Sequence, residues 1–179
     1  MIPTEEQAKT LWNKYDLPEP KRRHVALVAK VALFLADKIN KLINKPLLLA
    51  AALLHDIDKA VSKFPGERHP DSAVRILREE GMEEVASLVK THPLHAILDP
   101  TLAPTTWEEK LLYLADKMVK QAVVGVDARF KLWNGEHLSQ EAKLELDQAY
   151  PKVKELEKEI LKLTGLTSDQ ICNFFSPLV

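Results

Sequence analysis

The sequence predicts an all-α protein, and three observations point to that fold class. Glycine is scarce, with five among 179 residues, and no runs of alternating Val, Ile and Thr mark strands. Apolar residues instead recur at spacings of three and four over most of the chain. The 11 prolines fall mostly between these periodic segments, where helix boundaries are expected.

Length and composition favour a single globular domain over residues 1–179. Apolar residues make up 46% and charged residues 28% of the chain, as in ordinary folded proteins. The net charge of −1 argues against a surface devoted to nucleic acid. Cys172 stands alone, so we expect no internal disulfide, and no signal pattern opens the chain. We therefore expect a cytoplasmic protein without a membrane partner.

The first two helices are separated by a proline-containing break. The first is predicted over Thr4–Tyr15 and begins with a capping box, Thr4 with Gln7. Leu17-Pro18-Glu19-Pro20 ends it, and a second helix follows from about Lys21 to Ile39. One stripe of this second helix faces the core and contains His24, Val28, Val31 and Leu35.

An unbroken apolar run follows Pro46 and extends from Leu47 to Leu54. A helix that is apolar on all sides is a buried helix, and this one is far shorter than the roughly 20 residues of a membrane span. It ends in the ionisable segment His55-Asp56-Ile57-Asp58-Lys59. Buried ionisable groups need partners or a metal. The segment is therefore either a helix end that meets solvent or a metal site.

Two short helices and two loops are predicted next. Ser62–Arg68 is a loop, and His69-Pro70-Asp71-Ser72 begins a helix that ends at Gly81. Met82–His92 forms the next helix, with His92 on the same face as Val85 and Val89. The proline-containing loop Pro93–Thr105 is long enough to serve as a lid or a pocket rim.

The following helix carries an acid on its apolar face. Thr105 with Glu108, or Thr106 with Glu109, caps its start. Its predicted stripe consists of Leu112, Asp116, Val119 and Val123. The Asp116 carboxylate is either paired with a buried base or a metal ligand.

The C-terminal part predicts further helices without chemistry. From Ser139 to Leu163 apolar residues repeat at three and four, and Pro151 is expected to kink or split this stretch. We interpret residues 139–175 as a scaffold or a surface for a homodimer. A final helix over Thr167–Phe175 begins with the capping box of Thr167 and Gln170.

Six side chains with nitrogen or oxygen donors stand out from these apolar helices, and such donors suit Fe, Mn, Ni, Co or Zn. They are His24, His55, Asp56, His69, His92 and Asp116. Their order, with the pair in Ala51-Ala52-Leu53-Leu54-His55-Asp56-Ile57 and the last acid in Leu112-Tyr113-Leu114-Ala115-Asp116-Lys117, resembles the HD-domain metal-dependent phosphohydrolases. The resemblance covers about residues 20–130 and implies an HD-type helical bundle with a C-terminal extension.

Two histidines narrow the resemblance to the dinuclear branch of that superfamily. His69 and His92 look like the additional ligands of bacterial diadenosine tetraphosphate hydrolases and HD-GYP phosphodiesterases. The chain departs from the HD-GYP pattern, because Asp58 replaces the usual glycine and Pro93 follows His92. The resemblance therefore implies the dinucleoside polyphosphate branch rather than a cyclic dinucleotide phosphodiesterase.

The resemblance also implies a role for each residue. One or two divalent transition metals per chain would be held by His24, His55, Asp56 and Asp116, and by Asp56, His69 and His92. Asp56 would bridge them, and a metal-bound hydroxide would attack a phosphoester or phosphoanhydride of a nucleotide. Lys59 would contact a phosphate oxygen. Lys21, Arg22 and Arg23 either bind a second phosphate or form a solvated helix start.

Several alternatives stay open from the sequence. His95 is either a site residue or an exposed histidine, and His137 is expected to be exposed. Lys117 and Arg129 either reach the substrate or lie on solvated helix faces. The chain could be a non-catalytic HD module that senses a nucleotide or a metal. It could also be an all-α scaffold in which the six donors meet by coincidence.

Overall fold

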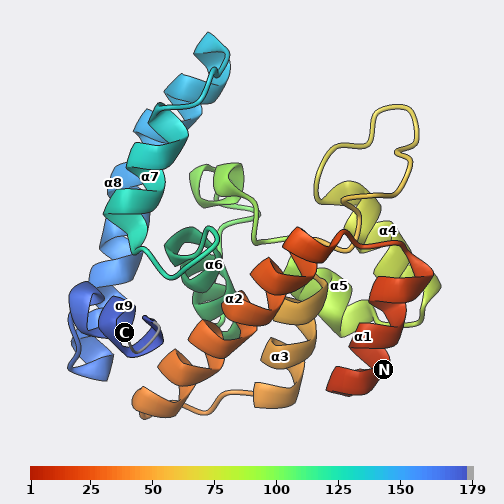
Figure 1. The fold of residues 1–179 in the computed structure, drawn as a ribbon, viewed down its shortest axis with the longest axis horizontal. Helices are drawn as coiled ribbons and strands as arrows, with labels where there is room; N and C mark the ends of the chain where they lie inside the picture. Colours follow the sequence, from red (N-terminus) through yellow and green to blue (C-terminus); the bar gives the residue numbers. More distant parts are fainter. Residues whose placement is uncertain (177–179) are drawn as a thin grey trace.

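The computed structural model describes residues 1–176, and these residues fold into α-helices, as predicted (Figure 1). The three remaining residues of the predicted 1–179 domain lie outside the described range. No helix in residues 1–176 has both the length and the apolarity needed to cross a membrane. The helical elements are α1 (Glu5–Lys14), α2 (Glu19–Lys38), α3 (Lys45–Leu54), α4 (Asp71–Glu79), α5 (Glu83–Val89), the 3-10 helix η1 (Leu94–Leu98), α6 (Trp107–Met118), α7 (Val126–Asn134), α8 (Gln140–Thr164) and α9 (Ser168–Phe175).

Helix α3 is the buried centre of the bundle. It packs against α1, α2, α5 and α6, and residues 50–54 are buried without exception. The indole Nε1 of Trp12 in α1 donates a hydrogen bond of 2.8 Å to the carbonyl of Leu53. This bond satisfies a carbonyl in the last turn of α3, where no intrahelical partner exists. The hydrogen bond from α1 thereby fixes the end of α3, which His55 and Asp56 directly follow.

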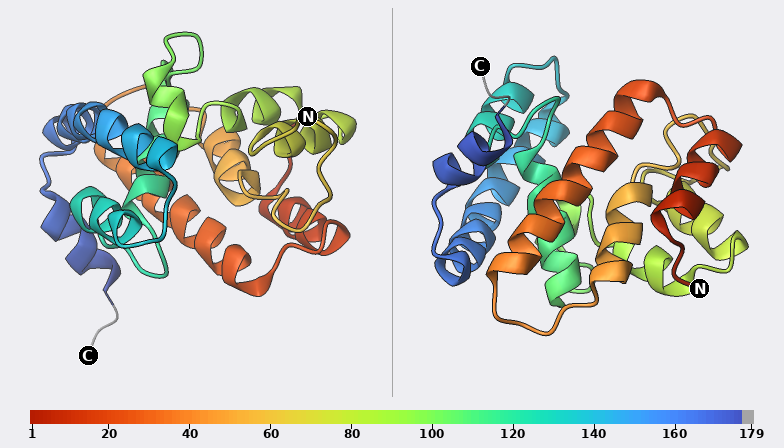
Figure 2. Two further views of the ribbon diagram at one scale, coloured as in Figure 1. Left: turned by 90° about the horizontal axis from the view of Figure 1, so that it is seen from above. Right: turned by 60° about the horizontal axis from the view of Figure 1, so that its bottom comes forward.

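The remaining helices surround this centre in two groups (Figure 1). Helices α1, α4 and α5 lie on one side of α2 and α3, and α7, α8 and α9 lie on the other. The long helix α8 runs beside α7 and also packs against η1 and α6. Both views of Figure 2 show α7 next to α8. Helix α6 lies between the two groups and contacts α2, α3, α7 and α8.

Most predicted helix starts are confirmed. Capping boxes are present at Thr4 with Gln7, Thr106 with Glu109, and Thr167 with Gln170. Of the two caps considered for α6, the structure has the one at Thr106. Gly81 follows α4 with a φ of +72°, the left-handed conformation expected after a helix end. The predicted loop over 93–105 contains the short helix η1.

The predicted stripe through Val119 and Val123 is wrong beyond Met118. Helix α6 ends there, and Val119 forms an isolated antiparallel bridge with Val123. The amides of Val124 and Gly125 donate to the carbonyl of Met118 and close a tight reversal. Gly125 has a φ of +81°, and α7, which was not predicted, begins after it. The chain therefore folds back at the end of α6.

Pro151 does not split the C-terminal stretch, because α8 is one helix from Gln140 to Thr164. A proline inside a helix removes one backbone hydrogen bond, and the exposed position of Pro151 leaves the freed carbonyl to water. The apolar stripe of α8 is buried within the chain. Its buried apolar residues are Leu146, Ala149, Val153, Leu156 and Ile160.

Candidate metal centre

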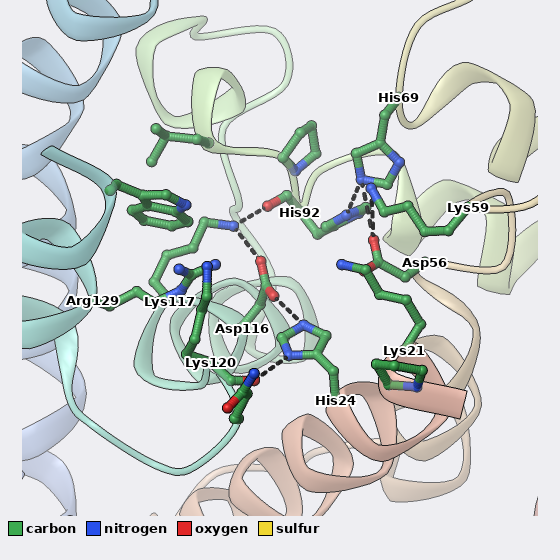
Figure 3. A pocket seen from close by; sticks show the side chains of 15 residues that line it. Lys21, His24, Asp56, Lys59, His69, His92, Asp116, Lys117, Lys120 and Arg129 are labelled. Atoms are coloured by element: carbon green, nitrogen blue, oxygen red, sulfur yellow. Dashed lines mark hydrogen bonds and ion pairs between the residues drawn. The ribbon is translucent and has the colours of Figure 1, made fainter. Parts of the chain in front are cut away.

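The six predicted ligands come from five separate places in the chain and meet in the structure. His24 lies in α2, His55 and Asp56 directly follow α3, and Asp116 lies in the last turn of α6. The other two stand at helix ends, His69 before α4 and His92 after α5. All except His55 line one pocket of about 420 Å³ (Figure 3). The His55 ring is 1% exposed and lies 5.5 Å from the ring of His24 and 4.9 Å from that of His92.

Two groups of donor atoms are close enough to hold a metal ion each. His24, His55 and Asp56 each offer a donor atom within 4.8 Å of the others, and so do Asp56, His69 and His92. Asp56 belongs to both groups. Asp116 lies beside the first group, with Oδ1 3.0 Å from Nε2 of His24 and 3.5 Å from Nε2 of His55. The structure thus brings together all six side chains in two adjacent clusters that share one carboxylate.

The four imidazoles are fixed in one tautomer by their surroundings. Nδ1 of His24, His55 and His92 faces a backbone carbonyl, of Lys120, Ala52 and Val89 respectively. Nδ1 of His69 faces the carboxylate of Asp58. Because carbonyl and carboxylate oxygens only accept, each Nδ1 carries the hydrogen and donates it. In the neutral ring Nε2 then has a free lone pair, which is the arrangement of metal-bound histidines.

These lone pairs face one another and the carboxylates. Nε2 of His69 lies 2.8 Å from Nε2 of His92, and Nε2 of His24 lies 3.0 Å from a carboxylate oxygen of Asp116. Nε2 of His55 is buried and has no hydrogen-bond partner in the described residues. Contacts between acceptors are unfavourable unless a proton or a cation lies between them. A divalent cation in each of the two donor clusters would remove these unfavourable contacts between acceptors. The residues present therefore fit a metal centre.

The electrostatics favour the metal-binding protonation state of Asp56, Asp116 and His92. Burial lowers the pKa of His55, but the carboxylates of Asp56 and Asp116 outweigh it and raise the pKa, so a metal would displace a proton there. Burial raises the pKa of Asp56, but His55, Lys59 and Lys21 outweigh it and leave the pKa far below its usual value. Burial likewise opposes ionisation of Asp116, and Lys117 holds its pKa well below the usual range. For His92, burial and the neighbouring His55 both lower the pKa. Both carboxylates are therefore ionised and His92 is neutral near pH 7, as metal binding requires.

Asp58 supports the second cluster and was given no role in the sequence prediction. Its side chain is 2% exposed. One oxygen lies 3.0 Å from Nδ1 of His69, and the other accepts a hydrogen bond of 2.7 Å from the hydroxyl of Ser72. Carboxylates that orient a ligating histidine in this way are common around metals. The signal in the sequence was the acid itself, at the position where the HD-GYP pattern has glycine.

Basic side chains line the same pocket. Lys59 and Lys21 lie 3.1 Å from Oδ1 and Oδ2 of Asp56, respectively. Lys117 is 2% exposed and donates to Oδ2 of Asp116 at 2.7 Å and to the carbonyl of His92 at 2.5 Å. Arg129 also lines the pocket. Lys117 and Arg129 both line the pocket, so the alternative that they lie on solvated helix faces is wrong. Residue type alone does not show whether a position on a helix is buried.

Other candidates lie apart from the pocket. His95 is half-buried in η1 and His137 is exposed between α7 and α8, and neither lines the pocket. Arg22 donates to Asn13 and to the carbonyls of Leu17 and Trp12, which is a structural role at the start of α2. Arg23 is exposed. Of the basic cluster 21–23, only Lys21 lines the pocket.

Comparison with protein families matches residues 22–120 to the HD domain. A search of the solved structures gives no match. The matched segment covers more than half of the 179 residues and includes all six predicted ligands. The chain belongs to the HD domain family.

Proposed function

We propose that this protein is a metal-dependent phosphohydrolase that cleaves a phosphoester or phosphoanhydride of a small molecule, with nucleotides as the expected substrates. The observation that carries the proposal is the convergence of four Nε2 lone pairs and two ionised carboxylates in a pocket that also contains basic side chains. Membership of the HD domain family supports the same reaction class.

The ligand assignment follows the two clusters. His24, His55, Asp56 and Asp116 would hold one ion, and Asp56, His69 and His92 the other. A donor set of imidazole and carboxylate suits Fe, Mn, Ni, Co or Zn. When bound, such ions polarise a phosphoryl oxygen and lower the pKa of a water molecule so that it becomes a nucleophile near neutral pH.

The other pocket residues bind and orient the substrate. Lys59 and Lys21 both pair with Asp56, and their charges become available to phosphate oxygens once that carboxylate is neutralised by cations. Lys117 holds the Asp116 carboxylate toward His24 and His55 through its bond to Oδ2. Its second bond, to the His92 carbonyl, ties α6 to the end of α5. Asp58 keeps His69 in the tautomer with Nε2 free.

Within this reaction class we place dinucleoside polyphosphates first. The support is the second cluster, because His69 and His92 stand where the sequence resembles the dinuclear diadenosine tetraphosphate hydrolases. If only one ion binds, His69 and His92 become pocket residues and nucleoside monophosphates become the first choice.

Metal content and hydrolysis test the proposal together. Protein purified without chelator is analysed for transition metals and assayed against a panel of nucleotides and p-nitrophenyl phosphate. We expect up to two ions per chain, with both metal and activity lost in Asp56→Ala. The control is Asp147→Ala, an exposed acid of α8, which should retain both.

Three other outcomes would contradict the hydrolase. Well-metallated protein that is inert across the panel, yet is stabilised by a nucleotide, would identify a binding module. Inert, well-metallated protein without any ligand response would leave only a structural metal. The absence of bound metal after addition of Mn, Fe or Ni would favour the scaffold.

A further inference from the structure

The pocket extends beyond the metal centre to a part of the chain outside the family match. Past residue 120 it is lined by Gln121 and by Arg129 and Trp133 of α7. Lys117 and Lys120 line the same pocket, and Figure 3 shows them with Arg129 on the side of the pocket where Asp116 lies. The volume of about 420 Å³ is in the range of pockets that hold whole small-molecule ligands. The pocket can therefore hold a further part of a molecule whose phosphoryl group lies at the metal centre.

The guanidinium of Arg129 has two buried donors without hydrogen-bond partners among the described residues. Nε and Nη1 are buried, and neither has a partner in residues 1–176. The group lies 3.9 Å over the Trp133 ring, which holds it in place without satisfying its donors. By contrast, Arg75 pairs with Glu67 and Arg78 pairs with Glu83. Buried unpaired donors of a charged group are costly, so this arginine is poised for an anion.

No acid of the pocket is free to pair with Arg129. The pocket contains five basic side chains (Lys21, Lys59, Lys117, Lys120 and Arg129) and two acidic ones, Asp56 and Asp116. Both acids already contact histidines and lysines of the metal centre. Among residues 1–176, the one ion pair of Lys120 is with Glu136, at 3.0 Å and on the surface. Such exposed pairs contribute little, so Lys120 can turn toward a bound anion.

The course of the backbone after α6 brings Arg129 to the pocket of the metal centre. The reversal after Met118, closed by the bridge between Val119 and Val123, returns the chain toward α6. Gly125 then starts α7, and Arg129 follows one turn later. The carbonyl of Lys120, inside the reversal, is the acceptor for Nδ1 of His24. The same turn therefore orients a proposed ligand and delivers Arg129 to the pocket.

We infer that Arg129, with Lys120, forms a second phosphate-binding subsite, so that preferred substrates carry a phosphate group in addition to the one that is attacked. The inference rests on the proposed function for the identity of the first phosphate. Arginine binds phosphate through its planar donor fork, and Arg129 has two donors of that fork, Nε and Nη1, without a partner in residues 1–176. The subsite selects phosphoanhydride chains and substrates with two phosphates over simple monoesters.

Binding of two stable probes tests the subsite. Methylenediphosphonate has two phosphonyl groups and a P–C–P link that is not hydrolysed, and phenylphosphonate has one phosphonyl group. Their Kd values are measured by calorimetry with metal-loaded wild type, Arg129→Ala and Lys131→Ala. Lys131 is an exposed base of the same helix and controls for charge and for helix stability. Melting curves verify that each variant is folded.

We expect Arg129→Ala to weaken binding of the bisphosphonate at least tenfold more than binding of the monophosphonate, and Arg129→Lys to recover part of the loss. Lys131→Ala should leave the ratio of the two Kd values unchanged. Equal effects of Arg129→Ala on both probes, or no effect, would overturn the subsite. If Arg129→Ala does not fold, failure of Lys120→Ala to shift the ratio would overturn it instead.

The two proposals fail in distinguishable ways. Wild type that turns over p-nitrophenyl phosphate but shows no probe discrimination through Arg129 retains the hydrolase and loses the subsite. Wild type that discriminates the probes through Arg129 but turns over no phosphate ester retains the subsite and loses the hydrolase.

Discussion

The carboxylate of Asp58 fixes the ring of His69, with Oδ1 and Oδ2 lying 3.0 and 3.1 Å from Nδ1. The contact holds Nε2 of His69 toward His92, at the second proposed metal position. Ser72 donates to the same carboxylate and keeps it from rotating. Three polar residues that are separated in sequence thus determine the direction of one lone pair.

Removing this contact should weaken the second metal position selectively. We expect Asp58→Ala to lower the affinity for the second ion by about 10–100-fold, because orienting carboxylates contribute that much around metals. Asp58→Asn, which keeps one acceptor oxygen, should lose less. Titration of metal-free protein with Mn or Fe measures both affinities, and Asp147→Ala is the control. Two unchanged affinities in Asp58→Ala would contradict the orienting role of Asp58.

Metal removal should destabilise the fold, because the facing Nε2 atoms and carboxylates lose the cations between them. At a metal concentration 100 times Kd, binding contributes about 2.7 kcal/mol, which corresponds to roughly 5–10 °C in Tm for a chain of this size. Calorimetry before and after chelation measures the shift. Asp56→Ala should show no response to the chelator; an equal response there would place the metal elsewhere.

Gly125 should tolerate substitution less well than Gly81, although both have positive φ. A Cβ at Gly125 would lie 2.9 Å from Oγ of Ser168, whereas a Cβ at Gly81 meets no atom within 4 Å. We expect Gly125→Ala to cost about 1–3 kcal/mol and Gly81→Ala the smaller part of that range. Denaturant unfolding measures both. Adding Ser168→Ala to Gly125→Ala should recover the difference, and its failure to do so would exclude the clash.

Glu80 should make stability sensitive to acid, and Tyr15 to alkali. Lys14 and Tyr15 of α1 donate to Glu80 and lower its pKa below the usual 4.5. The folded form is therefore favoured above pH 4.5, and this contribution is lost as the pH falls further. Burial and Glu80 raise the pKa of Tyr15 to about 12, so the favourable contribution below pH 10 is lost between pH 10 and 12.

Tm measured across pH checks both limbs. Glu80→Gln should flatten the acid limb and shift the alkaline limb toward the usual phenol range, whereas the exposed Glu6→Gln should change neither. An acid limb that is unchanged in Glu80→Gln would contradict the coupling between α1 and the end of α4.

Local signals explain what the sequence could predict. The capping boxes at Thr4, Thr106 and Thr167 involve residues three positions apart, so they are visible without the fold. Helix α3 was predictable because an apolar run on all sides fits only a buried helix. The six donors were recognisable from their order and their apolar helical context. Their mutual proximity agrees with that recognition.

The features that escaped prediction depend on tertiary contacts. The reversal after Met118 contains the apolar run Ala122-Val123-Val124, which in the sequence continues the helical pattern of α6. Only the structure shows that Val119 pairs with Val123 instead. Helix α7 was hidden for the same reason. Lys117 follows Asp116 directly, and adjacent helical residues point about 100° apart, so its burial could not be inferred from that spacing.

The reversal at Gly125 also separates the proposed metal ligands from the part of the pocket that α7 contributes. The proposed metal ligands lie within residues 22–120, whereas Arg129 and Trp133 belong to α7, which is supported by α8 and lies outside that segment. Substitutions or insertions in α7 and α8 can therefore alter which molecules are accepted without touching the ligands. With Arg129 as the proposed phosphate subsite, we expect proteins that share the HD segment to differ in selectivity through the helices after Gly125, which are the part to compare when substrates are assigned.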